Sequence, residues 1–156
     1  MKKILIAYGA LVILVVIIAV AKFNGFNFLP SFAKPTAEIN KQVYTLTLAK
    51  DEKSRKIGLS NRKSLDQKQG MLFIFPQKGI YSFWMKETEI PLDIIFIDED
   101  KIVYIVKNAK PQEDNHGTLP IYTPPTAGKY VLEINGGLSD KYSFKNGDAV
   151  ILKNAK

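Results

Sequence analysis

Residues 92–106 read LDIIFIDEDKIVYIV, and this stretch decides the expected fold. Two runs, residues 92–97 and 102–106, are apolar except for Asp93 and flank an acidic turn at residues 98–101. β-Branched and aromatic residues dominate both runs, as is typical of buried strands. The stretch therefore predicts a β-hairpin inside a mainly β domain.

Further strand signals lie on both sides of this hairpin. They cover residues 42–49, 71–75, 80–86, 129–134 and 149–152, and Gln77-Lys78-Gly79 suggests a second hairpin between residues 71–75 and 80–86. One short helix is expected at residues 52–57, with Asp51 as N-cap and Gly58 just after the end. Short antiparallel strands at near-regular spacing predict a small β-sandwich or a partly open barrel of about seven strands.

The first residues have a different character. Residues 4–21 carry no charge and follow Lys2 and Lys3. As a helix they would measure ~27 Å, close to the ~30 Å of a hydrocarbon core. We expect an N-terminal transmembrane helix with the rest of the chain outside the cytoplasm. The alternative is a signal peptide cleaved after Ala21, which would leave a secreted domain.

The chain thus divides into three predicted parts. Residues 1–21 form the anchor or signal peptide, residues 22–41 a tether, and residues 42–156 an extracytoplasmic β domain. The membrane, which residues 4–21 are expected to cross, is the one specific partner that the sequence predicts.

Charge and composition exclude several functions. Four basic residues and no acid lie in residues 1–37, so only three units of the net charge of +7 belong to the rest. Without a clustered basic stripe, we expect no nucleic-acid partner. The chain has no cysteine and a single histidine, His116, which makes a zinc site of the usual N and S ligands improbable. We therefore expect no metal and no cofactor.

The densest chemistry lies in residues 83–93, FWMKETEIPLD. Trp84 offers a stacking surface with one N–H donor, and Lys86 offers a cation. Thr88 and Asp93 complete a set of polar groups around a proline turn. The long, proline-containing loop at residues 107–128 is of the kind that often serves function. These observations predict a site for a small molecule or an envelope component at Trp84, Lys86, Thr88 and Asp93.

Other interpretations of the same residues compete with this one. Phe83 and Met85 are expected to pack in the core, and Lys86 and Asp93 suit an exposed ion pair of little energetic value. A structural or adaptor role is the second hypothesis. The third is a hydrolase of envelope polymers with Asp93 and Glu133 as acid and base. The competing interpretation of Glu133, which the sequence favours, is a solvated residue on the outer face of its strand. The sequence favours binding over a structural role and leans against catalysis.

A further pattern extends over five segments: Gly70–Phe73, Phe83–Lys86, Ile90–Phe96, Val131–Glu133 and Gly147–Asp148. Together these segments resemble the family catalogued as domain of unknown function 192. The resemblance spans roughly Tyr44 to Leu152 and implies a small, mainly β domain, often behind a signal or anchor. It implies no established activity and no catalytic residues. One departure is Glu87, where the family often has asparagine.

Overall fold

A computed structural model describes residues 2–23, 33–112 and 119–155 of the protein. The chain forms two compact units, Met1–Ala33 and Lys34–Lys156, and they are described separately. The first contains helix α1 (Lys2–Phe23), in which the side chains of residue 6 and residues 8–20 are described. Within the described residues, no helix is both long enough and apolar enough to cross a membrane. The transmembrane helix therefore stays a prediction.

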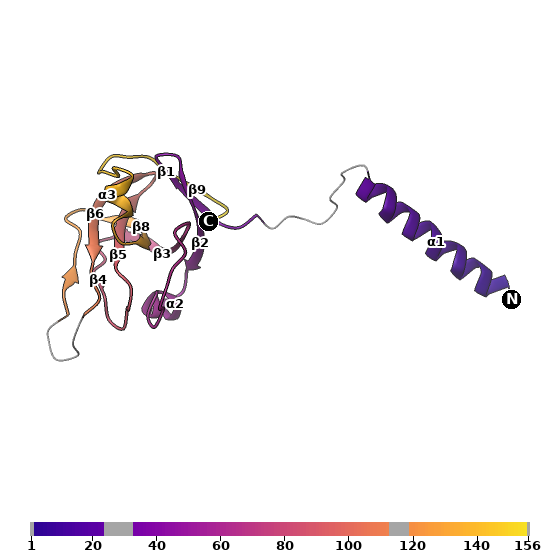
Figure 1. The fold of residues 1–156 in the computed structure, drawn as a ribbon, viewed down its shortest axis with the longest axis horizontal. Coiled ribbons are helices and arrows are strands. Elements are labelled where there is room, and N and C mark those ends of the chain that lie inside the picture. Colours follow the sequence, from indigo (N-terminus) through magenta and orange to yellow (C-terminus); the bar gives the residue numbers. More distant parts are fainter. Residues whose placement is uncertain (1, 24–32, 113–118, 156) are drawn as a thin grey trace. The chain divides into compact units, whose positions relative to one another are not determined.

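The second unit is mainly β (Figure 1). Its described residues form a seven-stranded sheet in the order β6-β5-β8-β3-β2-β1-β9 and a two-stranded sheet of β4 and β7. The strands are β1 (Thr36–Ile39), β2 (Gln42–Ala49), β3 (Gln69–Gly79), β4 (Phe83–Trp84), β5 (Leu92–Asp98), β6 (Lys101–Ala109), β7 (Ile121–Tyr122), β8 (Gly128–Asn135) and β9 (Val150–Lys153). The helices are α2 (Glu52–Ile57) and α3 (Leu138–Lys141).

The large sheet curls so that its two edge strands meet. Lys101, at the start of β6, forms an isolated bridge with Ala149, just before β9. The N–H of Val150 donates to the carbonyl of Asp100 at 2.7 Å, and that of Gly147 donates to Ile102 at 2.8 Å. The domain is thus a half-barrel closed at one point, in agreement with the partly open barrel that the sequence allows.

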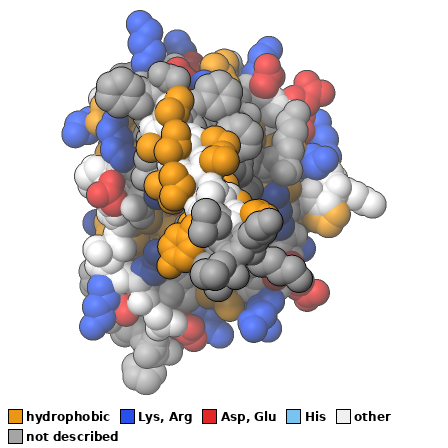
Figure 2. Space-filling model, turned by 90° about the vertical axis from the view of Figure 1, so that its right-hand side faces the viewer, with side chains coloured by type: hydrophobic (Ala, Val, Ile, Leu, Met, Phe, Trp, Pro, Cys, Tyr) orange, Lys and Arg blue, Asp and Glu red, His pale blue; other side chains and the backbone are white. Residues whose placement is uncertain are grey.

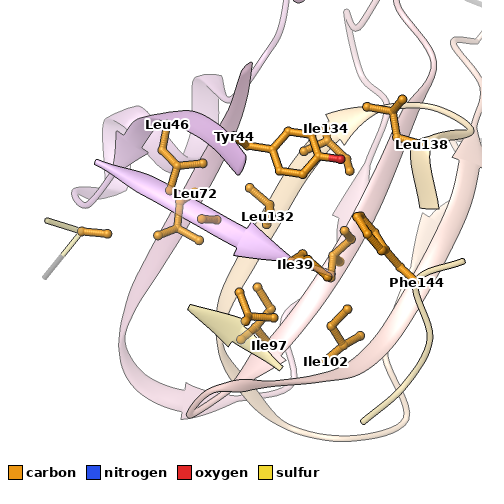
Figure 3. Close-up of a cluster of buried hydrophobic side chains, with 14 residues drawn as sticks. Ile39, Tyr44, Leu46, Leu72, Ile97, Ile102, Leu132, Ile134, Leu138 and Phe144 are labelled. Carbon is orange, nitrogen blue, oxygen red and sulfur yellow. The ribbon is translucent and has the colours of Figure 1, made fainter. Parts of the chain in front are cut away.

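Both faces of the curled sheet are buried. The inner cluster is shown in Figure 3, where Tyr44, Leu72, Leu132 and Ile134 from neighbouring strands converge with Phe144. The outer cluster includes Phe73, Phe96 and Val131. Burial on both faces explains why β5 is almost continuously apolar, because alternate residues enter different clusters.

The crossover between β2 and β3 is the main topological surprise. These strands pair in parallel, with Thr45 opposite Gln69 and Leu48 opposite Leu72. Parallel neighbours need a long crossover, and residues 50–68, which contain α2, supply it. The expectation of antiparallel strands is therefore wrong for this pair, and the crossover leads the chain through α2 before β3 begins.

Several predicted elements agree with the structure and others do not. Residues 42–49, the hairpin of β5 and β6, and α2 lie where the sequence places them. The hairpin at Gln77–Gly79 is wrong, because β3 continues to Gly79 and β4 pairs with β7 instead. Thr36–Ile39, expected within the tether, forms β1 and pairs with β2 and β9. His116 lies outside the described residues.

The charged side chains do not gather on the face seen in Figure 2. Lysine and arginine side chains are interspersed with aspartate and glutamate around its margin. Three ion pairs join described residues of the domain: Lys78 with Asp98, Lys107 with Asp140, and Lys153 with Glu38. The view shows no basic stripe of the kind that nucleic acids require.

Candidate functional site

A pocket of about 400 Å³ opens on the domain and is the strongest candidate site among the described residues. Its walls come from α2 and the turn after it, from β3, from the segment at residues 81–88, and from β8. Its volume is that of a small-molecule site. Trp84, Lys86 and Thr88 line it, as does Glu133.

α2 forms one wall, and its position is fixed by its two ends. At the start, Asp51 Oδ1 accepts from the Ser54 N–H at 2.8 Å, while Ser54 Oγ accepts from the Asp51 N–H at 3.2 Å. The Ser54 N–H, and the Ser54 hydroxyl, which donates to Asp51 Oδ2 at 2.8 Å, lower the pKa of the Asp51 carboxyl. At the end, Gly58 has φ +52°, and an added Cβ would lie 3.3 Å from the Phe73 ring. Glycine thus lets the chain turn closely over the pocket wall.

Arg55 connects α2 to the sheet, and its guanidinium already donates hydrogen bonds within the protein. Its Nη1 donates to the carbonyl oxygens of Lys50 at 2.5 Å and Ile74 at 3.0 Å. Its guanidinium also lies 5.4 Å from the centre of the Phe75 ring, within the range of a cation–π contact. Arg55 therefore supports the wall, and its hydrogen-bonding capacity for a ligand is reduced.

Aromatic side chains form the apolar part of the pocket. Phe83 packs edge-to-face on Phe73, with ring centres 5.0 Å apart. Phe75 stacks on Tyr81 at 3.6 Å. Both pairs bring residues of β3 together with the segment that leads into and through β4. The expectation that Phe83 and Met85 pack in the core is confirmed, since Met85 is 1% exposed and Phe83 joins the outer cluster.

Trp84 points the other way from these two neighbours and remains 49% exposed. It is held by the small sheet, in which it pairs with Ile121 of β7. The long loop between β6 and β8 therefore supplies the strand that positions Trp84. An exposed indole beside a pocket is an available stacking surface.

The turn after β4 places Lys86 and Thr88. The Thr88 N–H donates to the Met85 carbonyl at 3.2 Å, and Ser60 Oγ donates to the Lys86 carbonyl at 3.2 Å. Glu87 sits between them with φ +54°. Asparagine tolerates this left-handed conformation better than glutamate. The asparagine that the resemblance implies at this position would therefore adopt the turn with less strain.

Lys86 is exposed, and its ammonium has no hydrogen bond or ion pair with the described residues. Thr88 is 8% exposed, and its hydroxyl donates to the Lys86 carbonyl at 3.3 Å. Lys86 therefore offers a free cation on the solvent side of the pocket, while Thr88 lies deeper.

Glu133 is the most unusual group in the pocket. It belongs to β8, the third strand in the sheet order, where Met71 and Ile94 face it across the neighbouring strands. It is 5% exposed, and within the described part of the chain its carboxyl group has no hydrogen bond or ion pair. Burial raises its pKa to about 8. An unpaired buried carboxyl is costly to a fold, so it marks a site where a partner from solution would be favourable.

Asp93 does not belong to this pocket. In the register of β5 and β8, Asp93 is opposite Ile134 while Ile94 is opposite Glu133. Because side chains alternate along a strand, Asp93 and Glu133 project from opposite faces of the sheet. Asp93 is fully buried and accepts from the N–H groups of Asn108 at 2.7 Å, Gly137 at 2.9 Å and Ser139 at 2.6 Å.

The structure therefore brings three of the four predicted ligand residues to one pocket and removes the fourth. Asp93 is engaged by backbone groups, forms no ion pair with Lys86 among the described residues, and cannot act with Glu133 across a shared site. Sequence reasoning missed the aromatic residues of β3. It also treated Glu133 as an outer, solvated residue. Its apolar surroundings in YVLEIN were the available signal for a strand buried on both faces.

The half-barrel fold occurs in other proteins. A family model described as "Uncharacterized ACR", DUF192, matches residues 35–152, so the chain belongs to the DUF192 family. No curated protein matches the chain.

Two solved structures are similar. One is a protein of unknown function from Novosphingobium aromaticivorans, with 35% identity and a TM-score of 0.63, covering 75% of this chain and 82% of that one. The other, from Sinorhizobium meliloti, is called a "putative transcription regulator" and has 30% identity and a TM-score of 0.67, covering 76% of this chain and 91% of that one.

Proposed function

We propose that this protein is a membrane-tethered module that binds a small ligand in the pocket between α2, β4 and β8. One observation carries the proposal: the buried, unpaired carboxyl of Glu133 lines the same pocket as the exposed Trp84 and the unpaired Lys86. Apolar walls with a few polar groups are typical of small-molecule sites. A catalytic role has no comparable support, because Asp93 and Glu133 lie on opposite faces of the sheet.

The test uses Trp84, the single tryptophan of the chain, as the reporter. We expect small aromatic fragments to change its fluorescence and to raise the unfolding midpoint of the wild-type protein, because a ligand that binds only the folded state stabilises it. Trp84→Ala should lose the increase in midpoint. Ile151→Ala is the matched control, since Ile151 is 50% exposed on β9 and does not line the pocket.

The comparison of the two variants decides the outcome. Fragments that stabilise Ile151→Ala and not Trp84→Ala support the pocket. If no fragment shifts the wild-type midpoint or the Trp84 fluorescence, or if both variants respond equally, the pocket is not a ligand site and the proposal is wrong.

The tether is proposed from the N-terminal segment. Residues 4–21 are uncharged, α1 contains 22 residues, and the large apolar side chains described in it are between 50% and 71% exposed. Apolar surface of this extent is unfavourable in water and favourable in hydrocarbon. Lys2 and Lys3 before the run support a domain outside the cytoplasm. Cleavage after Ala21 remains the alternative.

An adaptor role is the second candidate. Ile57 and Trp84 line the pocket, and Ile121 pairs with Trp84; these side chains are 53%, 49% and 65% exposed. A protein partner that covers the pocket mouth would bury them. If a protein partner binds in place of a small ligand, it would shield these side chains from solvent while leaving the interior of the pocket empty.

A further inference from the structure

We propose that the ligand of this pocket has a protonated amine at its inner end, an aromatic body, and an anionic group at its outer end. The inference rests on the proposed binding function and specifies the chemical class of the ligand. Each part of the ligand corresponds to a different group of residues in the pocket.

The amine of the ligand would bind the carboxyl group of Glu133. A buried carboxyl without a partner gains most from a group that supplies both hydrogen-bond donors and a positive charge. Its cross-strand neighbours Met71 and Ile94 offer neither. A bound ammonium would hold Glu133 as the carboxylate, whereas in the free protein burial raises its pKa to about 8. Binding of an amine near pH 7 therefore releases a proton.

The aromatic body corresponds to the walls. Phe73, Phe83 and Trp84 line the pocket, and Trp84 is half exposed before any ligand binds. Offset or edge-to-face contacts with such rings favour an aromatic ligand beyond simple burial. The pocket volume of about 400 Å³ leaves room for one ring with substituents at both ends.

The anionic end corresponds to the lysines on the solvent side. Lys56 and Lys86 are exposed, line the pocket, and have no hydrogen bond or ion pair with described residues. The other charged groups in the lining are Arg55 and Glu52, both from α2, and the remaining titratable group is Tyr81. With Glu133 protonated, the lining carries more positive than negative charge. A purely cationic ligand is therefore disfavoured, and an anionic outer group compensates.

The experiment compares three probes of one shape on the full-length chain in detergent micelles. The probe 4-(2-aminoethyl)benzoate carries both charged ends. Its methyl ester lacks the anion, and 4-(2-hydroxyethyl)benzoate lacks the amine. Binding is measured from the NMR shift of the Trp84 indole N–H. We expect the zwitterion to bind about tenfold more tightly than either relative, as a charge-assisted hydrogen bond allows.

Calorimetry in buffers of different ionisation enthalpy measures the proton. Near pH 7 the zwitterion should release a proton from Glu133 on binding, because burial keeps that carboxyl mainly protonated in the free protein. The hydroxyl probe should release none. This measurement needs only the wild-type protein, so it does not depend on whether any variant folds.

Two variants assign the ends of the ligand. Glu133→Gln should remove the preference for amine over hydroxyl and keep the preference for carboxylate over ester. Lys86→Met should do the reverse. Lys145→Met, which changes an exposed lysine outside the pocket lining, should alter neither preference.

The outcomes separate this inference from the function on which it rests. If no probe shifts Trp84, while the fragments above also fail, both the binding function and the ligand class are wrong. If all three probes bind equally and none releases a proton, the pocket binds aromatic ligands but the inferred charge pattern is overturned.

Discussion

At the scale of single residues, Glu133 makes the clearest prediction. Its folded-state pKa of about 8 lies above the ordinary value of 4.5. The folded state therefore holds this proton more tightly than the unfolded state, and the resulting stability is fully present below pH 4.5 and lost as pH rises through 8. Each unit of difference corresponds to ~1.4 kcal/mol. The free energy of unfolding of wild type should therefore fall by several kcal/mol across this window, relative to Glu133→Gln.

Chemical denaturation at pH 5, 7 and 9 measures this difference. Glu52→Gln is the matched control, because Glu52 is an exposed carboxylate lining the same pocket. It should follow the pH dependence of wild type. Parallel curves for wild type and Glu133→Gln would show that the carboxyl is not desolvated, and would contradict the prediction.

The location of a side chain could be predicted where residues nearby in sequence determine it, and not where residues distant in sequence do. Trp84, Lys86 and Thr88 are close in sequence, and one turn carries them to one pocket, so sequence proximity was sufficient. Asp93 is equally close, but alternation along β5 places it on the opposite face of the sheet. Its carboxylate receives backbone N–H groups from residues 108, 137 and 139. Such distant backbone donors leave no pattern in the side-chain sequence.

At the scale of elements, Asp93 joins β5, β6 and α3. The N–H of Asn108 lies at the irregularity between β5 and β6, and the N–H groups of Gly137 and Ser139 lie at the start of α3. Asp93→Asn replaces one acceptor oxygen by a donor that faces these N–H groups. Hydrogen bonds to charged groups are worth ~1.5–3 kcal/mol each, so we expect a loss of about 3 kcal/mol in the free energy of unfolding.

Equilibrium denaturation checks this value. The control is Asp140→Asn, which breaks an exposed ion pair with Lys107 and should cost less than ~1 kcal/mol. Ligand binding to the pocket should be unchanged in folded Asp93→Asn, because Asp93 does not line it. A variant that keeps wild-type stability but loses ligand binding would show that Asp93 belongs to the binding site, and would refute its structural role.

Elements with strong local sequence signals could be predicted, whereas strands that form only by pairing with another strand could not. α2 has a capping box at one end and glycine at the other, and the β5–β6 hairpin has an acidic turn between two apolar runs. β4 and β7 contain two residues each and exist because they pair with one another. β1 is similarly short and turns into β2 through Asn40 and Lys41, both with positive φ. Asparagine followed by lysine is a weaker turn signal than asparagine followed by glycine.

At the scale of the whole molecule, two apolar parts of the chain contrast. In the domain, alternate residues of β5 enter clusters on the two faces of one curled sheet. In α1, the described apolar side chains are exposed. Composition and periodicity distinguish these cases, which is why the mainly β domain and the separate N-terminal segment could both be predicted. The closure between Lys101 and Ala149 joins segments far apart in sequence, so no local sequence pattern predicts it.

The last prediction concerns these two parts. Residues 34–156 form a compact unit that includes both hydrophobic clusters. We therefore expect a chain of residues 34–156 to unfold at the same midpoint as the full-length protein and to stay in the aqueous phase. The full-length protein should sediment with lipid vesicles, because burying residues 4–21 in hydrocarbon removes apolar surface from water.

A charged variant of the full chain is the control for this partition. Val15→Lys combined with Val16→Lys places two charges in the apolar run, at ~2.5–3.5 kcal/mol each near a membrane centre. It should abolish sedimentation and leave the unfolding midpoint of the domain unchanged. Wild type that remains aqueous, or a charged variant that still sediments, would refute the anchor. An exported product that begins at Lys22 would instead identify the segment as a signal peptide cleaved after Ala21, because a cleaved segment cannot hold the domain at the membrane.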